Sequence, residues 1–314
     1  MKAVEYNKKG SPEKLIYKEI KKPTPNDDEV LLKVYATSIN AADYRSIAMG
    51  SIPKKKVFGA DVSGRVESVG KNIQKFKQGD EVIGDLSDHG FGGFAEYAVA
   101  PEKALVLKPA SISHEEAAAI PLAAITALQA IRNKGQIQKG QQVLIVGSSG
   151  GVGTFAVQLV KYFGAEVTAV CSTRNLEQSK NIGADNLIDY TKEDFTKSDK
   201  RYDLVLAING NYSLFGYKRI LKKNGTYVMI GGSMVQIIKT LLFSKILSLG
   251  SKNMYSLFAK SNQKDVELVV KLVEDEKIKP IIEKRYPLDK TSTAMGYVGE
   301  GHAKGKVVIN LECE

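Results

Sequence analysis

A run of small residues stands between two apolar segments near the middle of the 314-residue chain. Apolar residues 142–146 lead into Gly147, Gly150, Gly151 and Gly153, and a second apolar stretch with helical spacing follows. Glycines let the backbone turn sharply from a strand into a helix, whose unpaired N–H groups and positive dipole end can bind a pyrophosphate. The flanking strand and helix favour a dinucleotide site over an ordinary tight turn. The phosphate contacts are expected at Ser148, Ser149, Gly150, Gly151 and Val152.

The end of the next predicted strand indicates which dinucleotide is bound. An NAD site usually has Asp or Glu at this place, because a carboxylate holds the ribose 2′-hydroxyl and repels a 2′-phosphate. This chain has Ser172, Thr173 and Arg174 there. Two hydroxyls and a guanidinium suit a phosphate, since arginine offers bidentate charge-assisted hydrogen bonds. An exposed loop with a solvated arginine is the alternative, and we expect NADPH.

The bulk composition restricts the function classes. The chain has only two cysteines, Cys171 and Cys313, far apart, so neither a disulfide framework nor a cysteine metal cluster is expected. The formal net charge is +10, but lysines are spread along the chain and Lys54, Lys55 and Lys56 form the longest basic cluster. A nucleic-acid groove would need clustered basic and aromatic residues, so no nucleic-acid partner is expected. No leader-like segment opens the sequence, which predicts a cytoplasmic protein.

The elements that position these groups fall into two types. Short alternating runs at 29–35, 61–68, 81–84 and 95–100, separated by turn residues, predict a compact, partly open β-barrel. A Ser113–Glu116 capping box and a helical run then mark a junction. From residue 141 onward, strands alternate with helices, which predicts a doubly wound parallel sheet. The expected fold is α/β: a domain of residues 1–118, completed by 265–314 with a last strand at 305–310, and a second domain of residues 119–264.

The order of the motifs resembles the quinone oxidoreductase-like members of the medium-chain dehydrogenase/reductase superfamily over essentially the whole chain. The matching segments are residues 38–45 (SINAADYR), 59–64 (GADVSG), 92–97 (GGFAEY), 118–128, the glycine turn, 183–185 with 188–190, and 301–302 with 305–306. The resemblance implies a GroES-like domain, a Rossmann domain, and hydride transfer from NADPH to a quinone or an α,β-unsaturated carbonyl.

Departures from the zinc-dependent relatives restrict the chemistry further. Asn40 stands at the position of their cysteine ligand, and Ala60 and Asp61 replace their His-Glu pair. Zinc needs thiolate or imidazole ligands there, so no metal is expected. Simple alcohol oxidation is harder without a Lewis acid. A conjugated acceptor spreads the developing charge itself.

The resemblance also implies roles for individual residues. Tyr44 is a candidate donor to the substrate oxygen, Asn40 lies on the substrate side, and Arg45 is expected to reach a cofactor phosphate. Water is the alternative source of the proton. Further cofactor contacts are expected at Thr126, Tyr190, Asn209, Gly231, Gly232, His302 and Lys304. The alternatives are a helix-internal threonine, a strand-end aromatic and a solvated turn.

Two segments concern assembly. Residues 234–250 are apolar with Lys239 and Lys245, too short to span a bilayer but suited to lie on an anionic one. A helix that covers the sheet or flanks the substrate mouth is the preferred interpretation. Residues 252–258 are expected to form an edge strand that pairs in a homodimer. The alternative function is an NADPH-binding regulatory or nucleic-acid-binding protein with little turnover.

Overall fold

The computed structural model describes residues 1–6, 14–50, 56–232, 234–248 and 250–311. They form two compact units, unit 1 with Met1–Ile125 and Lys260–Glu314, and unit 2 with Thr126–Ala259. The two ends of the chain thus share one unit, and the boundaries predicted after residues 118 and 264 lie a few residues from these. Lys54, Lys55 and Cys313, noted from the sequence, lie outside the described residues.

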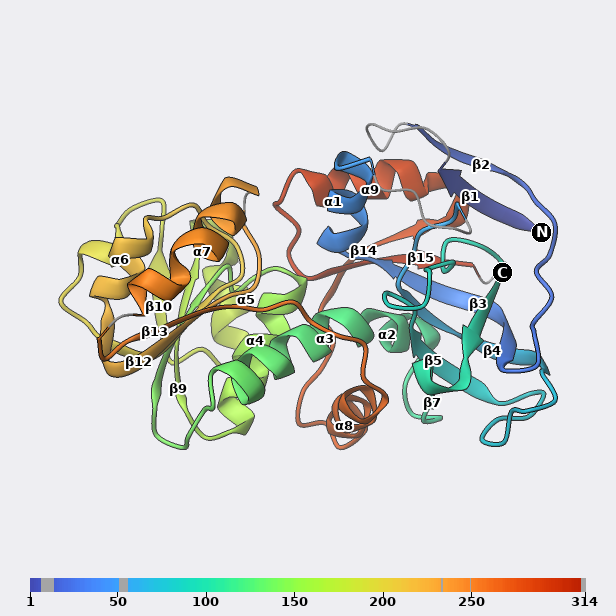
Figure 1. Ribbon diagram of the computed structural model, residues 1–314, viewed down its shortest axis with the longest axis horizontal. Helices are drawn as coiled ribbons and strands as arrows, with labels where there is room; N and C mark the ends of the chain where they lie inside the picture. Colours follow the sequence, from blue (N-terminus) through green and yellow to red (C-terminus); the bar gives the residue numbers. More distant parts are fainter. Residues whose placement is uncertain (7–13, 51–55, 233, 249, 312–314) are drawn as a thin grey trace. The chain divides into compact units, whose positions relative to one another are not determined.

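Unit 1 is built on a seven-stranded sheet of order β14-β15-β3-β4-β5-β7, with β6 also paired to β3, and on the separate hairpin β1-β2. The strands are β1 Lys2–Tyr6, β2 Leu15–Glu19, β3 Glu29–Ile39, β4 Asp61–Val69, β5 Glu81–Asp85, β6 Tyr97–Pro101, β7 Leu105–Leu107, β14 Ile282–Pro287 and β15 Lys306–Asn310. The helices are α1 Ala41–Ala48, α2 His114–Ala119, α8 Gln263–Glu274 and α9 Thr291–Gly299. Helices α1 and α9 pack against each other (Figure 1).

The predicted junction helix is divided in two. The capping box is confirmed, because the Ser113 side chain accepts from the Glu116 N–H and the Glu116 side chain accepts from the Ser113 N–H. Helix α2 nevertheless ends at Ala119, and α3 Pro121–Leu128 follows. Proline has no N–H to donate and disfavours helical backbone at the residue before it, so Pro121 begins a new helix.

Unit 2 contains a six-stranded parallel sheet of order β10-β9-β8-β11-β12-β13. Its strands are β8 Gln142–Val146, β9 Glu166–Cys171, β10 Asn186–Asp189, β11 Tyr202–Ala207, β12 Leu221–Met229 and β13 Asn253–Ser256. Its helices are α4 Gly151–Tyr162, α5 Leu176–Asn181, α6 Leu214–Arg219 and α7 Met234–Leu247. The chain runs outward from β8 in both directions, which makes the carboxyl end of β8 the topological switch point, where such sheets bind ligands.

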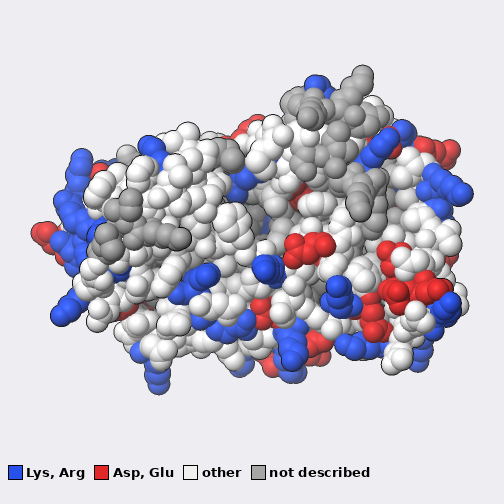
Figure 2. Space-filling model, viewed as in Figure 1, with Lys and Arg blue, Asp and Glu red and all other residues white. Residues whose placement is uncertain are grey.

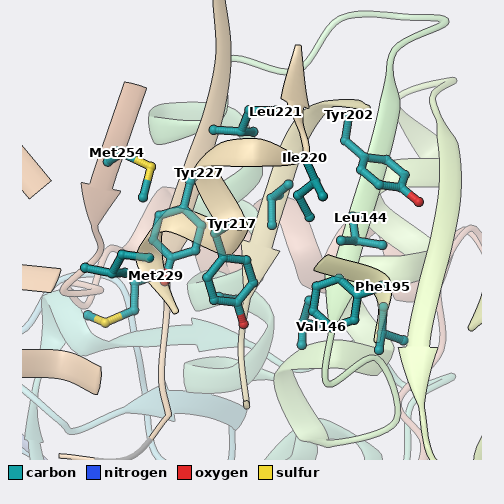
Figure 3. Packing of buried hydrophobic residues seen from close by; sticks show 14 of the residues in the cluster. Leu144, Val146, Phe195, Tyr202, Tyr217, Ile220, Leu221, Tyr227, Met229 and Met254 are labelled. Carbon is teal, nitrogen blue, oxygen red and sulfur yellow. The ribbon is translucent and has the colours of Figure 1, made fainter. Parts of the chain in front are cut away.

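Both faces of this sheet are buried. Leu144 and Val146 lie in one core cluster with residues of α6 and α7, whereas the intervening Val143 and Ile145 are buried toward the other face (Figure 3). Tyr227 of β12 packs its ring 4.8 Å, centroid to centroid, from an α6 tyrosine. Helices on both faces confirm the doubly wound prediction and hold the strand ends in fixed register. No helix among the described residues is long and apolar enough to cross a membrane.

Candidate functional site

The turn after β8 has the form of a phosphate cradle. A Cβ on Gly153 would lie 2.1 Å from the Gly147 carbonyl oxygen, and one on Gly147 would lie 2.9 Å from Asn209 N, so both glycines permit close backbone packing. A Cβ on Gly150 would meet nothing within 4 Å. Gly150 is also the N-cap of the 12-residue helix α4, and no side chain caps it. The first N–H groups of α4, from Gly151 and Val152, therefore face open space suited to an anion.

The two serines of this turn are held by protein groups. The Ser148 hydroxyl lies 3.0 Å from the Ser179 hydroxyl, and the Ser148 N–H donates to the Val170 carbonyl. Ser149 Oγ accepts from Asn175 Nδ2 at 2.9 Å. The expected hydroxyl donors thus brace the turn against the segment after β9. Sequence inspection missed Asn175, whose position directly after the Ser172–Arg174 loop is the signal that could have indicated it.

Three predicted residues meet at the carboxyl edge of the sheet. The Asn209 N–H donates to the Val146 carbonyl at 3.2 Å, and the Gly231 N–H donates to the Ala207 carbonyl at 3.2 Å. Gly232 follows with a φ of +124°, a conformation that favours glycine. The structure therefore brings the ends of β8, β11 and β12 together beside the cradle.

The end of β9 lies beside the end of β10. Cys171 pairs with Asp189, and the Tyr190 N–H donates to the Cys171 carbonyl at 3.1 Å, so Tyr190 shares this edge with Ser172 and Arg174. Arg174 is exposed on a short 3₁₀ turn. The edge thus gathers the residues predicted for the adenosine end of a cofactor.

Asp189 is a carboxylate at this edge that the sequence analysis did not single out. Thr173 Oγ1 donates to Asp189 Oδ2 at 2.5 Å, and the Thr191 hydroxyl donates to Oδ1 at 2.7 Å. These hydroxyl bonds, with a smaller contribution from Lys192, lower the pKa of Asp189 to about 2. The end of β10 is aligned with the end of β9 by the parallel register, which is the signal that could have revealed it.

In unit 1, Asp61 is the centre of a buried polar network. Asp61 Oδ2 accepts from Ser38 Oγ at 2.6 Å and from Asn40 Nδ2 at 2.8 Å, and Oδ1 accepts from the Leu122 N–H at 2.8 Å. Lys306 Nζ lies 3.1 Å from Asp61 Oδ2, and the two side chains are 2% and 0% exposed. The network joins the ends of β3, β4, β15 and the start of α3.

Asn40 is fixed by the same network. Its Nδ2 donates to Asp61, and its Oδ1 accepts from Lys306 Nζ at 2.7 Å, so the orientation of the amide is determined at both ends. Asn40, which aligns with the cysteine ligand of the metal-dependent relatives, and Asp61, which aligns with the glutamate of their His-Glu pair, therefore both bind the Lys306 ammonium. An amide oxygen and a carboxylate already bonded to Lys306 do not form a zinc donor set.

Two further carboxyls are buried near Asp61. Asp43 accepts from the Asn40 N–H at 2.9 Å and from the Gly59 N–H at 3.3 Å, and Asp85 lies opposite Asp61 in the β4–β5 register. Desolvation, reinforced by the charge of Asp61, raises the pKa of Asp43 to about 7 and that of Asp85 to about 6. The Lys306 ammonium thus balances the charge of Asp61. The raised pKa values of Asp43 and Asp85 favour their neutral, protonated forms.

Tyr44 and Arg45 both lie on α1. A Cβ on Gly299 would come within 2.2 Å of the Tyr44 ring, so the small residue in α9 makes room for this ring. Arg45 is half-buried, and desolvation lowers its pKa. The structure places both residues on the helix that directly follows Asn40.

The other predicted residues lie outside the sheet edge. Thr126 is half-buried on α3 and begins unit 2. His302 is exposed and Lys304 is half-buried in the segment between α9 and β15. The Lys304 N–H donates to Glu283 Oε2 at 2.6 Å, which ties this segment to β14.

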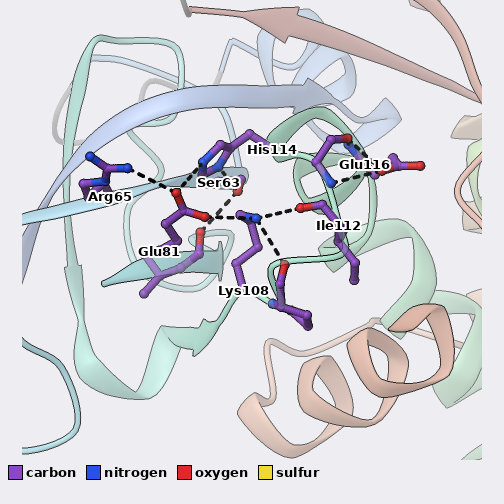
Figure 4. A network of polar contacts seen from close by, with 10 residues as sticks. Ser63, Arg65, Glu81, Lys108, Ile112, His114 and Glu116 are labelled. Atoms are coloured by element: carbon purple, nitrogen blue, oxygen red, sulfur yellow. Dashed lines mark hydrogen bonds and ion pairs between the residues drawn. The ribbon is translucent and has the colours of Figure 1, made fainter. Parts of the chain in front are cut away.

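A second polar network in unit 1 has the residue types of a nucleophile, a base and an acid. Ser63 Oγ lies 2.8 Å from His114 Nδ1, and His114 Nε2 lies 3.6 Å from Glu81 Oε1 (Figure 4). Ser63 is completely buried, and Lys108 and Arg65 both bind Glu81. A nucleophile must reach its substrate, so this network fastens the start of α2 to β4 and β5 rather than performing acyl transfer.

Comparison with known proteins gives the same family. Residues 26–110 match the alcohol dehydrogenase GroES-like domain family, and residues 182–309 match the zinc-binding dehydrogenase family. The chain is 35% identical to the chloroplast envelope quinone oxidoreductase homolog of Arabidopsis thaliana over 98% of both proteins. It is 30% identical to that plant's chloroplastic NADPH-dependent alkenal/one oxidoreductase, over 98% of this chain and 79% of the relative.

A solved structure agrees with the sequence comparisons. The quinone oxidoreductase from Coxiella burnetii superposes with a TM-score of 0.91 at 28% identity and covers 99% of each chain. The GroES-like unit, the parallel sheet with its glycine turn, and the relatives matched over nearly the whole length lead to one assignment. The chain belongs to the quinone oxidoreductases of the medium-chain dehydrogenase/reductase superfamily.

Proposed function

We propose that the protein is a zinc-independent, NADPH-dependent reductase that transfers a hydride to a quinone or to a carbon–carbon double bond conjugated with a carbonyl. The observation that carries this proposal is the Asn40–Asp61–Lys306 network, because the Lys306 ammonium binds two residues that align with the zinc-site motifs of the metal-dependent relatives. Relatives named as quinone and alkenal/one oxidoreductases support the acceptor class.

The cofactor is assigned to unit 2. The uncapped N-terminus of α4 and the open space at Gly150 suit the pyrophosphate, and Arg174 suits a 2′-phosphate. Asp189 lies at the same edge, but Thr173 and Thr191 bind its carboxylate. When bound, the nicotinamide supplies the hydride. The chain's own residues orient the cofactor across the strand ends.

The acceptor groups are assigned to unit 1. Zinc chemistry stabilises an alkoxide directly, whereas conjugation lets a quinone or enone spread the developing charge over several atoms. The protein then needs only to orient the acceptor, exclude water and donate a hydrogen bond to its oxygen. Tyr44 is the proposed donor. Asn40 is proposed to line the substrate side, with its amide held in one orientation by Asp61 and Lys306. The proton that completes the reduction comes from Tyr44 or from water.

An acceptor screen tests the proposal. Oxidation of NADPH and of NADH is followed at 340 nm with naphthoquinones, 2-alkenals, enones and, as a control, simple aldehydes. We expect turnover with the conjugated acceptors, a preference for NADPH, and no loss of rate after treatment with a zinc chelator. A zinc-dependent alcohol dehydrogenase treated in parallel supplies the matched control for chelation.

Two results would contradict the proposal. Loss of activity on chelation, restored by zinc, would reject zinc independence. If none of the conjugated acceptors supports NADPH oxidation, the reductase assignment is rejected. The regulatory or nucleic-acid-binding alternative would then be the one to test. No feature of the described residues favours that alternative, and the curated relatives reported above are named as oxidoreductases.

The remaining assignments concern the whole protein. We propose that the GroES-like part handles the acceptor and the Rossmann part the cofactor, as two functional domains. We propose a homodimer that pairs through the edge strand β13, and a cytoplasmic location. Light scattering of the purified protein, and of a variant with Pro at Tyr255 of β13, tests the dimer, because proline disrupts strand pairing.

A further inference from the structure

The segment after β9 carries Arg174 and is anchored at its far end. We call residues 172–175 the β9 turn. Asn175, its last residue, is buried, and its Nδ2 donates to Ser149 Oγ of the glycine turn at 2.9 Å. Arg174 is exposed directly before this fixed point.

A second anchor holds the β9 turn from the side of β10. Thr173 Oγ1 donates to Asp189 Oδ2 at 2.5 Å, although the two residues are 16 positions apart in the sequence. Cys171 and Asp189 are partners in the parallel register, so the paired ends of β9 and β10 bring this contact about. Arg174 therefore stands between two anchored residues, Thr173 and Asn175.

The chain contains a second copy of the local motif around Asp189. Residues 189–192 (DYTK) and 194–197 (DFTK) share one pattern. In each, the aspartate Oδ1 accepts from the N–H and the hydroxyl of the threonine two residues later, at 3.0 and 2.7 Å. In each, the lysine three residues later approaches Oδ2, at 3.7 and 3.5 Å respectively.

The two copies differ in one long-range bond. Within the described part of unit 2, only the aspartate of the first copy, Asp189, also receives a hydroxyl from the end of another strand. The local motif is complete without that bond, as the copy at Asp194 demonstrates. The contact with Thr173 therefore serves the β9 turn rather than the turn that contains Asp189.

The bond also determines which groups of the β9 turn can bind a phosphate. A hydroxyl has one hydrogen to donate, and Thr173 gives it to Asp189, so the Thr173 side chain does not donate to a ligand. Ser172 and Arg174 are the remaining side-chain donors of the pattern. The Thr173 bond is the largest cause of the low pKa of Asp189, about 2, so the acceptor stays charged at neutral pH.

The overall positive charge of the chain does not explain a choice between cofactors. The formal net charge is +10, and Figure 2 shows Lys and Arg side chains spread over the visible face with acidic side chains among them. A diffuse positive charge attracts any phosphate, and NADH and NADPH contain the same pyrophosphate. Discrimination therefore depends on groups at the ribose position, which is the end of β9.

We propose that Asp189 is a positioning residue for cofactor choice. Through the Thr173 hydroxyl, it holds the β9 turn in the form in which Ser172 and Arg174 bind the 2′-phosphate. Because this role concerns NADPH, it rests on the proposed function. An acid at such a strand end ordinarily binds the ribose hydroxyl of NAD. Asp189 instead uses one oxygen for each of two threonine hydroxyls.

Calorimetric titration with NADPH and NADH tests this role without an acceptor. Thr173→Val keeps the shape of the side chain and removes the hydroxyl. It should weaken NADPH binding about five- to tenfold and NADH binding less than about twofold, because the hydrogen bond that positions the turn is lost. Thr173→Ser keeps the hydroxyl and should bind both cofactors like the wild type. Thr196→Val removes the equivalent hydroxyl of the 194–197 copy and should leave the ratio unchanged.

Asp189→Asn separates the positioning role from a direct contact of Thr173 with the phosphate. The exchange replaces one carboxylate oxygen by an amide donor and removes the charge that strengthens the bond. It should lower the preference for NADPH about as much as Thr173→Val, and the double variant should lose no more than either single variant. In an Arg174→Ala background, Thr173→Val should have no further effect, since the group it positions is absent. Asp194→Asn is the matched control, and the thermal midpoint without cofactor checks that each variant folds.

Four outcomes would overturn the proposal. If only Thr173→Val changes the ratio, Thr173 contacts the phosphate directly and Asp189 has no part in the choice. Tighter NADPH binding by Asp189→Asn would show that the carboxylate acts by repulsion. Equal losses of both cofactors would assign Asp189 to the ribose or to the fold alone.

The fourth outcome distinguishes this role from the proposed function. Wild-type protein that binds NADPH and NADH equally rejects the NADPH preference, and the positioning role with it. A wild type that prefers NADPH, with the same ratio in Thr173→Val and Asp189→Asn, rejects the positioning role and leaves the proposed cofactor in place.

Discussion

Lys306 is the residue on which the proposed zinc independence of unit 1 depends. It supplies the counter-charge to the completely buried Asp61 and also binds the Asn40 amide oxygen. The sequence analysis could read Asn40 and Asp61 as departures from zinc ligands, because ligand types are visible in a motif. It gave Lys306 no role, since only the folded β15 brings a residue 245 positions away to Asp61.

Lys306→Met is therefore expected to destabilise the protein by about 3–5 kcal/mol, because it leaves a buried carboxylate without a counter-charge. Urea unfolding measures the loss. Adding Asp61→Asn to Lys306→Met should cost less than the sum of the two single changes, by about 1–3 kcal/mol. Lys71→Met removes a lysine from the exposed pair with Asp27 and should change stability by less than about 1 kcal/mol. Equal effects of Lys306→Met and Lys71→Met would refute this role.

The second prediction at the residue scale concerns Arg174, the proposed partner of the 2′-phosphate of NADPH. Arg174→Ala should weaken NADPH binding about 10- to 100-fold, because a charge-assisted hydrogen bond contributes roughly 1.5–3 kcal/mol, and should leave NADH nearly unaffected. Equilibrium titration of both cofactors measures the ratio. Lys197→Ala removes an exposed positive charge elsewhere in unit 2 and should not change that ratio. Equal losses for both cofactors after Arg174→Ala would remove the 2′-phosphate assignment.

At the scale of elements, the glycines of the β8–α4 turn have two separable tasks. Gly153→Ala should destabilise unit 2 by more than about 2 kcal/mol, because its Cβ would overlap the Gly147 carbonyl and only backbone movement can relieve this. Gly150→Ala should change stability by less than about 1 kcal/mol, since its φ of −81° suits alanine and the space is open. Its Cβ would, however, occupy the space assigned to the pyrophosphate.

Gly150→Ala should therefore lower NADPH affinity by about tenfold or more while the thermal midpoint stays near that of the wild type. Thermal unfolding without cofactor and fluorescence titration with NADPH supply the two readouts. Unchanged NADPH binding by a folded Gly150→Ala protein would show that the pyrophosphate lies elsewhere.

Strands that alternate in polarity were predictable, and elements defined by tertiary contacts were not. The expected runs at 29–35, 61–68 and 81–84 correspond to β3, β4 and β5, because one face of each is buried. Helices α1 and α9 were missed, since they are short and gain their stability from packing against each other. The face that α7 buries was also hidden, because periodicity shows that a helix has faces but not which face is buried.

At the scale of the whole molecule, the sequence predicted the topology of the doubly wound sheet but not the side-chain partners within the candidate site. Local β-α-β repetition determines a parallel sheet and its switch point, and the glycine turn falls there. The side-chain partners depend on contacts across long sequence separations, such as Asn40 with Lys306, and no spacing rule reports them. The fold therefore follows from local pattern, whereas the charge balance of the site follows from topology.

The buried carboxyls make the stability of the whole protein depend on pH. The folded-state pKa is about 7 for Asp43 and about 6 for Asp85, above the ordinary value, so the native state binds more protons than the unfolded state between about pH 4 and 7. Stability should therefore fall as the pH rises through this window, by at most about 3 kcal/mol for Asp85 alone. Asp85→Asn should remove that part of the slope in urea unfolding, whereas exposed Asp27→Asn should not. Parallel pH profiles for wild type and Asp85→Asn would contradict this linkage.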